Sequence, residues 1–210
     1  EEKGNYRIAD RVRELVSFSY LNLLDPTKIG NIDAVWNSVF VSLLSVLCSG
    51  VVGVFLAIVL TQVQFPLRAM FSRIAVVPIA LPPLVGVISF LFVFGESGIL
   101  PRVLQTIFHS SSVPFFLDGI PAIVVVHTFS FHVYYYLFVS SALRQVDGSI
   151  LEAAANLGST PWNTFRKVIL PELRPALVGA SILTFMASMA SFTAPLIFAG
   201  GKRFITLAIY

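Results

Sequence analysis

Residues 152–171 form a polar stretch between two long apolar segments, and their spacing suits hydrogen bonding at helix ends rather than catalysis. Ser149 and Glu152 have the spacing of a capping box, in which the serine hydroxyl and the glutamate carboxylate both bond backbone amides. The small residues at 153–155 continue the helix at little cost in side-chain entropy. Gly158 suits the left-handed conformation that commonly ends a helix. The first half of the stretch therefore predicts a short capped helix and a tight turn.

The second half of the stretch predicts another helix. Thr160-Pro161 resembles an N-cap followed by proline at the first helical position. We expect this helix to run to about Ile169 and to stop at Pro171. Trp162 and Phe165 are expected to anchor it against the neighbouring bundle. Such a hairpin is too polar to lie in lipid and is suited to transmit force between a soluble partner and a membrane bundle.

The rest of the chain is dominated by apolar segments. Hydrophobic residues make up 56% of the sequence and charged residues 12%, against roughly 25% charged in an average soluble domain. Each apolar segment without Asp, Glu, Lys or Arg is at least as long as the roughly 20 residues that cross a bilayer. These segments are residues 34–67, 74–95, 119–143 and 175–201. Because a helix satisfies its own backbone hydrogen bonds in lipid, the sequence predicts an all-α, polytopic membrane helical bundle.

The polar stretch also matches a known motif. Its fixed positions are Glu152-Ala153-Ala154, then Gly158 after three residues, then Val168 after nine more, then Ile169 and Leu170-Pro171. This spacing resembles the EAA loop of permease subunits from bacterial ABC importers, with Val168 in place of isoleucine. The residues around the motif, at 157–162 and 192–195, look most like those of the ferric-iron and polyamine branch of that family.

The resemblance implies a fold and a role. The chain would be a MetI-like transmembrane domain of a type I ABC importer, in which the permease subunit forms the translocation path. ATP hydrolysis would belong to a separate ATP-binding cassette subunit, so this chain is not expected to be an enzyme or to hold a cofactor. The loop residues that dock on that subunit would be Glu152, Ala153, Ala154, Gly158, Leu170 and Pro171.

Further partners follow from the resemblance. They are a periplasmic or lipid-anchored substrate-binding protein, a second permease domain on the same or a separate chain, and the lipid bilayer of the bacterial inner membrane. The family usually has more spans than the four found here, which implies a fragment. We divide the chain into an amphipathic, external N-terminal segment at residues 1–33 and a permease core at 34–210, with the coupling loop at 144–174.

The distribution of positive charge predicts the orientation. The loops at residues 61–73 and 144–174 together carry six Lys or Arg residues, whereas the loop at 96–118 carries only Arg102. Because short cytoplasmic loops are enriched in Lys and Arg, the hairpin is expected in the cytoplasm. The basic residues that flank the first and last spans argue for the opposite orientation.

Candidate path-lining residues lie where the spans are interrupted or polar. Pro82-Pro83 removes two backbone donors from the second span and must bend or break it. Such breaks are tolerated where they are buried in protein or face a cavity. Thr184, Ser188 and Ser191 recur on one face of the fourth span, which is either a packing seam or the polar lining of a path. The lining candidates are Pro82, Pro83, Ser188, Ser191 and Thr193.

The histidines and the cysteine give little support for catalysis or metal binding. His127 and His132 are separated by roughly 140° around a helix, so both cannot face one metal ion, and each is expected in a polar helix–helix contact. Cys48 is the only cysteine, which excludes a disulfide or a cysteine-based metal site within the chain. The sequence has no phosphate-binding loop of the Walker type. Its basic residues are scattered, which argues against nucleic acid binding.

Two other classes of protein were weighed. An ion-coupled secondary transporter commonly has ionisable residues inside the membrane, and the four apolar segments contain no acidic or basic side chain. An intramembrane enzyme would use His127 or His132 with nearby serines, but paired carboxylates and a metal-ligand motif are missing. For the importer, ferric iron is the first expected substrate, a polyamine the second and an oxyanion such as sulfate the third.

Overall fold

The computed structural model describes residues 26–109 and 116–208, with side chains described from residue 32 onward. Within these ranges the chain is helical and contains no strand, so the predicted all-α fold is confirmed. The expected amphipathic character of the N-terminal segment at 1–33 falls almost entirely outside the described side chains and stays a prediction.

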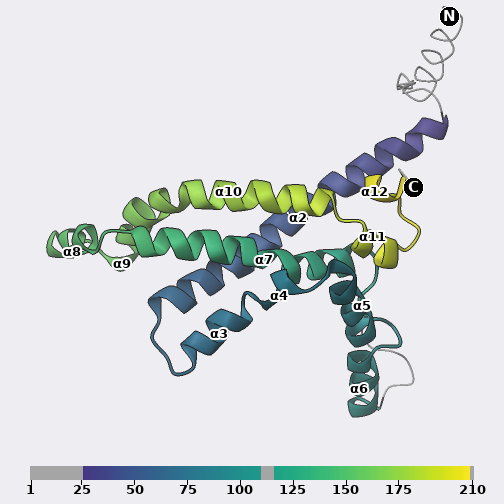
Figure 1. Ribbon diagram of the computed structural model, residues 1–210, viewed down its shortest axis with the longest axis horizontal. Coiled ribbons are helices and arrows are strands. Elements are labelled where there is room, and N and C mark those ends of the chain that lie inside the picture. Colours follow the sequence, from purple (N-terminus) through teal and green to yellow (C-terminus); the bar gives the residue numbers. More distant parts are fainter. Residues whose placement is uncertain (1–25, 110–115, 209–210) are drawn as a thin grey trace, which may run out of the picture.

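Three long helices form the body of the molecule: α2 (Pro26–Gln62), α7 (Gly119–Gln145) and α10 (Leu170–Met189). α2 and α7 run in the same sense, and α10 runs back along them, so that α2 ends at the end of the bundle where α10 begins (Figure 1). A buried apolar cluster that includes Ala57, Tyr136 and Leu173 joins the three helices toward that end.

The second apolar segment is broken, as its prolines predict. It begins at the last residue of α3 (Arg68–Ile74) and contains α4 (Val77–Ala80) and the whole of α5 (Pro83–Phe94), which α6 (Ile99–Ile107) follows. Leu81 and Pro82 are extended, with ψ of 131° and 132°, because Pro82 and Pro83 cannot donate the hydrogen bonds that would continue α4.

Four described helical segments are long and apolar enough to cross a membrane, but their bounds differ from the apolar segments of the sequence. They are Ile32–Gln62, Pro83–Ile107, Gly119–Gln145 and Pro161–Met189. The predicted segment at 74–95 was wrong at both ends, since the second candidate begins only after the proline break and reaches α6. The third prediction, at 119–143, is confirmed.

The first and fourth helices end earlier than their apolar segments. α2 stops at Gln62, and there the Arg68 side chain folds back and donates hydrogen bonds to the carbonyl oxygens of Leu60 (2.7 Å) and Thr61 (2.9 Å). These carbonyls have no partner within the helix at its C-terminus, so the arginine caps it. α10 ends at Met189, and the chain bends at residues 190–192 before α11 (Thr193–Phe198).

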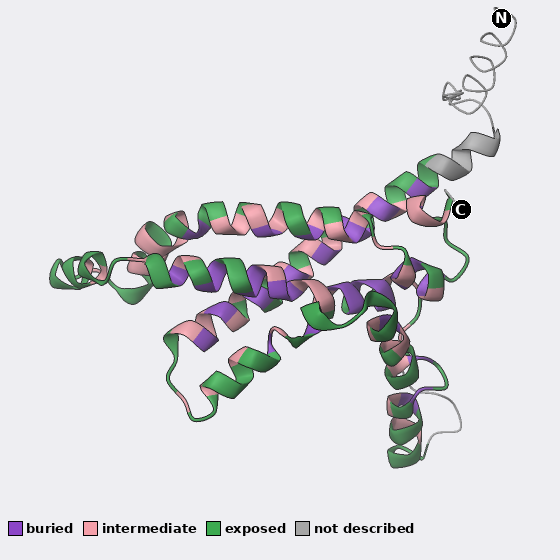
Figure 2. Ribbon diagram, in the orientation of Figure 1, coloured by how far each residue is buried: buried purple, intermediate pink, exposed green. Residues whose placement is uncertain are grey.

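The outward faces of the long helices are apolar. Leu47, Val51 and Phe55 on α2 are 63%, 66% and 63% exposed, and exposed and buried stretches alternate along each long helix (Figure 2). Soluble monomers rarely expose large continuous apolar patches. These faces therefore suit contact with lipid or with further membrane helices.

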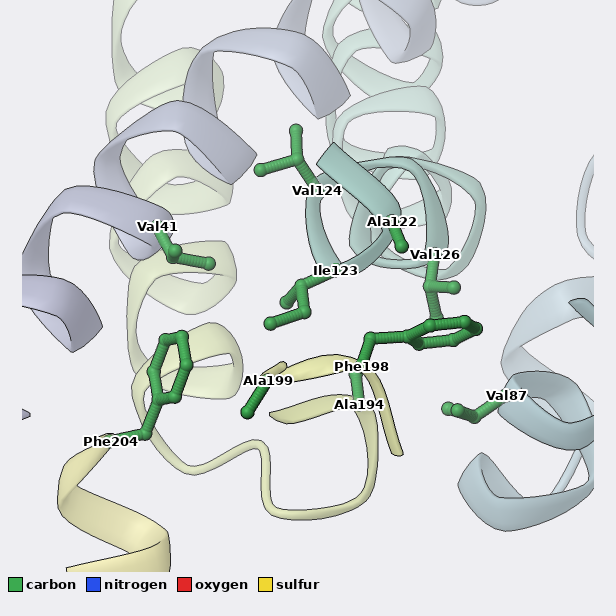
Figure 3. Packing of buried hydrophobic residues seen from close by; sticks show 10 residues of the cluster. All are labelled: Val41, Val87, Ala122, Ile123, Val124, Val126, Ala194, Phe198, Ala199 and Phe204. Atoms are coloured by element: carbon green, nitrogen blue, oxygen red, sulfur yellow. The ribbon is translucent and has the colours of Figure 1, made fainter. Parts of the chain in front are cut away.

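A second buried apolar cluster holds the opposite end of the bundle together. In Figure 3, Val41 of α2 and Ile123 of α7 face Phe204, while Phe198 of α11 lies against Val126 of α7. The chain end that follows, α12 (Ile205–Ala208), is tied to α2. The backbone amide of Ile205 donates to the hydroxyl of Ser38 at 3.0 Å. This end of the molecule fixes where α11 begins, and with it one wall of the cavity described below.

Candidate functional site

A helical hairpin joins α7 to α10 and protrudes from the end of the bundle (Figure 1). Its first arm is α8 (Gly148–Asn156), and its second arm consists of α9 (Pro161–Thr164) and the π-helix η1 (Phe165–Ile169). The helix–turn–helix arrangement predicted for residues 152–171 is therefore confirmed.

The residue that caps the first arm differs from the prediction. Asp147, not Ser149, is the N-cap, and its Oδ1 accepts a hydrogen bond from the backbone amide of Ser149 at 2.9 Å. The predicted capping box was wrong because Ser149 already lies inside α8, one residue after Gly148. The hydrogen bonds from Ser149, first from its amide and then from its side chain, lower the pKa of the Asp147 carboxyl.

Acidification is expected to fray the first arm. Because the pKa of Asp147 is lower in the folded hairpin, its contribution to helix stability is present above the unfolded pKa and is lost as the pH falls through the folded value. The protection factor of the Ser149 amide, measured by hydrogen exchange and corrected for the intrinsic pH dependence of exchange, should fall in the wild type as the pH goes from neutral to acidic. Asp147→Asn keeps an acceptor oxygen without a titrating group, so its exchange should lack this acid transition. A transition of the same size in Asp147→Asn would rule out the carboxylate cap as its cause.

The turn between the arms is a Schellman motif. The amide of Gly158 donates to the carbonyl oxygen of Ala155 at 2.9 Å, and the amide of Ser159 donates to that of Ala154 at 3.0 Å. Gly158 has φ of +73°, the left-handed conformation predicted for it, and glycine adopts this conformation without steric cost. Two carbonyls at the end of α8 are satisfied in this way, so the turn has a defined geometry.

The second arm continues directly into α10. Thr160 caps α9 as predicted, with Oγ1 accepting from the Asn163 amide at 3.4 Å. The expected stop at Pro171 was wrong, because the chain stays helical through η1 and into α10. In η1 the Leu170 amide bonds the carbonyl of Phe165, a wider turn than in an α-helix. Pro171 lies in the first turn of α10, directly after this wider turn.

The hairpin exposes large apolar side chains at its free end. Leu157 is 88% exposed and Trp162 is 67% exposed, and the Trp162 ring stacks on Phe165 with centroids 5.8 Å apart. The expectation that Trp162 anchors the second arm against the bundle was therefore wrong, whereas Phe165 is half-buried. Of the docking candidates, Glu152, Ala153 and Gly158 are exposed; Ala154, Leu170 and Pro171 are half-buried.

A cavity of about 400 Å³ lies within the bundle, where α4, α5, α7 and the break between α10 and α11 meet. α7 contributes His127, Ser130 and Tyr134, which share one face of the helix. Among the five path-lining candidates, Pro83, Ser191 and Thr193 line this cavity.

His127 ties three segments together beside the cavity. Its Nδ1 lies 3.0 Å from Ser45 Oγ of α2 and 3.1 Å from Ser188 Oγ of α10, and its Nε2 lies 2.9 Å from Ser191 Oγ. The predicted polar helix–helix contact is thus confirmed for His127. Ser188, the fourth path-lining candidate, is 5% exposed and packs against this imidazole.

His132 does not make the contact predicted for it, and Pro82 does not line the cavity. His132 bonds the carbonyl oxygen of Phe129 on its own helix, with Nδ1 at 2.7 Å, so the predicted contact between helices is wrong for this residue. Pro82 is exposed beside the break that it causes. In the described ranges no group of three His, Cys, Asp or Glu side chains could hold a metal ion.

Sequence reasoning did not identify Ser45, Ser130 or Tyr134 as site residues. Ser45 belongs to a buried serine series on α2 at positions 38, 42, 45 and 49, a helical spacing that places all four on one face. The sequence alone could therefore have identified Ser45 as a residue on a polar, buried face of α2. Ser130 and Tyr134 became candidates only when the cavity brought them opposite Thr193 of another segment.

These features define a multi-pass helical membrane protein with a protruding hairpin and an internal cavity. Residues 49–210 match the family described as "Binding-protein-dependent transport system inner membrane component". The chain belongs to this family, and the ABC importer permease family inferred from the EAA-like spacing is confirmed.

Curated relatives are similar over most of this chain. It is 33% identical to the molybdenum transport system permease protein ModB of Mycobacterium tuberculosis, over 77% of this chain and 59% of that protein. It is 30% identical to a putative ferric transport system permease protein, FbpB 1, of Haemophilus influenzae, over 83% of this chain and 27% of that protein. The chain spans less than two thirds of the length of these relatives.

Solved structures share the fold. An inward-facing form of the MetNI methionine ABC transporter matches with a TM-score of 0.63 and 22% identity, covering 84% of this chain and 78% of that one. An amino acid ABC transporter with histidines matches with a TM-score of 0.55 and 20% identity, covering 92% of this chain and 89% of that one.

Proposed function

We propose that this chain is a permease subunit of an ATP-driven ABC importer, and that it moves a small solute across the bacterial inner membrane. A separate ATP-binding cassette subunit hydrolyses ATP, a substrate-binding protein delivers the solute, and a second permease domain completes the path. Family membership and four membrane-crossing helical segments support this assignment.

The observation that carries the proposal is the continuity between the hairpin and the bundle. The second arm leads through η1 into α10 without a break, and α10 reaches Ser188, whose hydroxyl contacts His127 beside the cavity. A displacement of the hairpin is thereby transmitted along one helix to the cavity wall. The exposed Leu157 and Trp162 offer apolar surface for a docking subunit at the other end of this lever.

The proposed orientation places the hairpin in the cytoplasm, where ATP is available. The loop between α2 and α3 lies at the same end of the bundle as the hairpin (Figure 1). α3, directly after this loop, carries Arg68 and Arg73, and residues 144–174 carry four more Lys or Arg residues, as cytoplasmic segments do. This arrangement supports docking of the ATPase on Glu152, Ala153, Ala154 and Gly158, with Leu170 and Pro171 at the entry to α10.

The names of the relatives support a proposal for the class of solute that this chain transports. They include ferric, molybdenum and sulfate transport permeases, so we propose a small inorganic cargo, which makes the polyamine alternative less favoured. The resemblance at 157–162 and 192–195 favoured ferric iron within this set, and the chemistry of the cavity, considered below, adds a second criterion.

Removing the exposed indole of the hairpin tests the proposed docking. Trp162→Ala should weaken co-purification of the ATPase about thirtyfold and reduce ATP-driven uptake, since a central interface tryptophan contributes on the order of 2 kcal/mol. Trp36→Ala is the matched control, because Trp36 on α2 is 69% exposed, close to the 67% of Trp162, but is remote from the hairpin. Unchanged ATPase capture and uptake in Trp162→Ala would be incompatible with docking through this hairpin.

A further inference from the structure

Two interruptions of membrane-embedded helix face the same cavity. One is the extended backbone at Leu81–Pro82 between α4 and α5, and the other is the bend at residues 190–192 between α10 and α11. Leu81, Pro83, Ser191 and Thr193, which flank these breaks, all line the cavity. Irregular backbone at membrane depth is tolerated where it is buried in protein or lines a cavity. Two breaks around one cavity therefore indicate a binding site for a polar solute.

The cavity lies near the middle of α7. Its lining residues on this helix run from Val126 to Tyr134, about 10–22 Å from the start of a helix that is about 40 Å long at 1.5 Å per residue. A solute held there would be near the centre of the bilayer, the depth at which broken helices form binding sites in transporters.

Three hydroxyl groups in the cavity wall remain available for hydrogen bonding. Ser130, Tyr134 and Thr193 line the cavity, all are half-buried, and within the described part of the chain their hydroxyls make no hydrogen bond. These hydroxyls are therefore free to donate hydrogen bonds to a solute in the cavity. A ligand bearing several oxygen acceptors would satisfy all three at once.

The imidazole of His127 is already committed to protein contacts. Ser45 Oγ donates to the Val41 carbonyl oxygen at 2.7 Å, so it accepts from His127 Nδ1–H, and Nε2 then accepts from Ser191. Both ring nitrogens are therefore occupied, and His127 forms part of the wall without being free to coordinate a metal ion.

The cavity wall contains no charged side chain of either sign. A bare ferric ion is a hard cation that needs anionic oxygen ligands, and a polyamine needs carboxylates to balance its ammonium groups. Neither finds them in the described wall. An oxyanion needs only hydrogen-bond donors, and bonds to a charged acceptor are stronger than bonds between neutral groups.

We infer that this cavity is a transient binding site for an oxyanion, held by the hydroxyls of Ser130, Tyr134 and Thr193. The inference rests on the proposed importer function and names the chemical class of its solute. The anion is either free, as molybdate or sulfate is, or carried as the ligand of a ferric complex. The absence of a fixed counter-charge keeps the site weak enough for the anion to leave.

Equilibrium binding to the assembled transporter tests this inference. The complex of permease domains and ATPase, in lipid nanodiscs without the binding protein, would be titrated with radiolabelled molybdate, sulfate, ferric iron with and without phosphate, and putrescine. Molybdate or sulfate should bind. Ser130→Ala, Tyr134→Phe and Thr193→Val should each weaken that binding about tenfold, because each removes one donor to a charged acceptor.

Ser89→Ala is the matched control for Ser130→Ala. Ser89 lies on α5 outside the cavity and bonds the Val85 carbonyl oxygen of its own helix at 2.8 Å, so its removal should leave anion binding unchanged. Iron that binds only together with phosphate, and that responds to the three substitutions, would also support the inference and identify the anion as a ligand of the metal.

Preferential binding of putrescine or of iron without phosphate would overturn the inference. So would anion binding that ignores all three substitutions, or the absence of binding by every probe. These results leave the importer assignment intact, because that assignment depends on ATPase capture by the hairpin and on Trp162, which lies outside the cavity.

Discussion

The Gly158→Val substitution is expected to weaken capture of the ATPase subunit by at least about tenfold while leaving the membrane-embedded helices folded. Gly158 has φ of +73°, and a non-glycine residue in the left-handed region costs roughly 1–2 kcal/mol, most for a β-branched one. A Cβ at this position would meet no atom within 4 Å, so the effect comes from backbone strain alone. The turn would open, and the two arms would lose their mutual geometry.

Gly148→Val is the matched control on the same hairpin. Gly148 begins α8 without a positive φ, and a Cβ there also meets open space. Co-purification from membranes, scored against equal amounts of inserted permease, should fall for Gly158→Val and persist for Gly148→Val. Equal capture by the two variants would show that ATPase binding does not depend on the geometry of this turn.

The hairpin was predictable because its signals are local. A left-handed glycine and a Thr-Pro helix start act over a few residues, and the structure has both where the sequence placed them. The cap was misplaced by two residues because Asp147 and Ser149 are both good N-caps, and the sequence does not say which one remains outside the helix. Continuity through Pro171 depended on a π-turn, which has no clear sequence signature.

The span boundaries were harder to predict because hydropathy does not distinguish helix from apolar loop. The segment at 63–67 carries no charge, yet the chain reverses there, with Leu67 in the left-handed conformation and Arg68 reaching back to cap α2. Residues 190–192 are similarly uncharged, and the bend between α10 and α11 was missed. The proline pair at 82–83 was the exception, because proline removes backbone donors whatever its surroundings.

The cavity could be predicted only in part. Pro83, Ser191 and Thr193 were candidates from break and polarity signals within their own segments. Their grouping with Ser130 and Tyr134 depends on how α5 and α11 pack on α7, which is long-range information. A single sequence contains no direct record of which helix faces which.

The Gly53→Leu substitution is expected to separate α2 from α7 and to prevent assembly of the bundle. A Cβ at Gly53 would lie 2.5 Å from the Tyr135 Cβ and would also collide with the carbonyl oxygen of His132, which belongs to the backbone and cannot rotate away. Forced overpacking in a well-packed core commonly costs about 1–3 kcal/mol, and a clash with backbone belongs at or above the top of that range. Thermal unfolding of the purified complex and its elution as a single species would measure the loss.

The matched control is Gly86→Leu on α5, where a Cβ meets no atom within 4 Å. Leucine has a higher helix propensity than glycine by somewhat less than about 1 kcal/mol, so this variant should be as stable as the wild type or slightly more stable. The contrast separates close packing from helix propensity, since both sites are helical glycines. If Gly53→Leu melted like Gly86→Leu, the α2–α7 contact would be able to relax by several tenths of an ångström. The His127 contact that depends on it, to Ser45 of α2, could then not hold the cavity wall in one position.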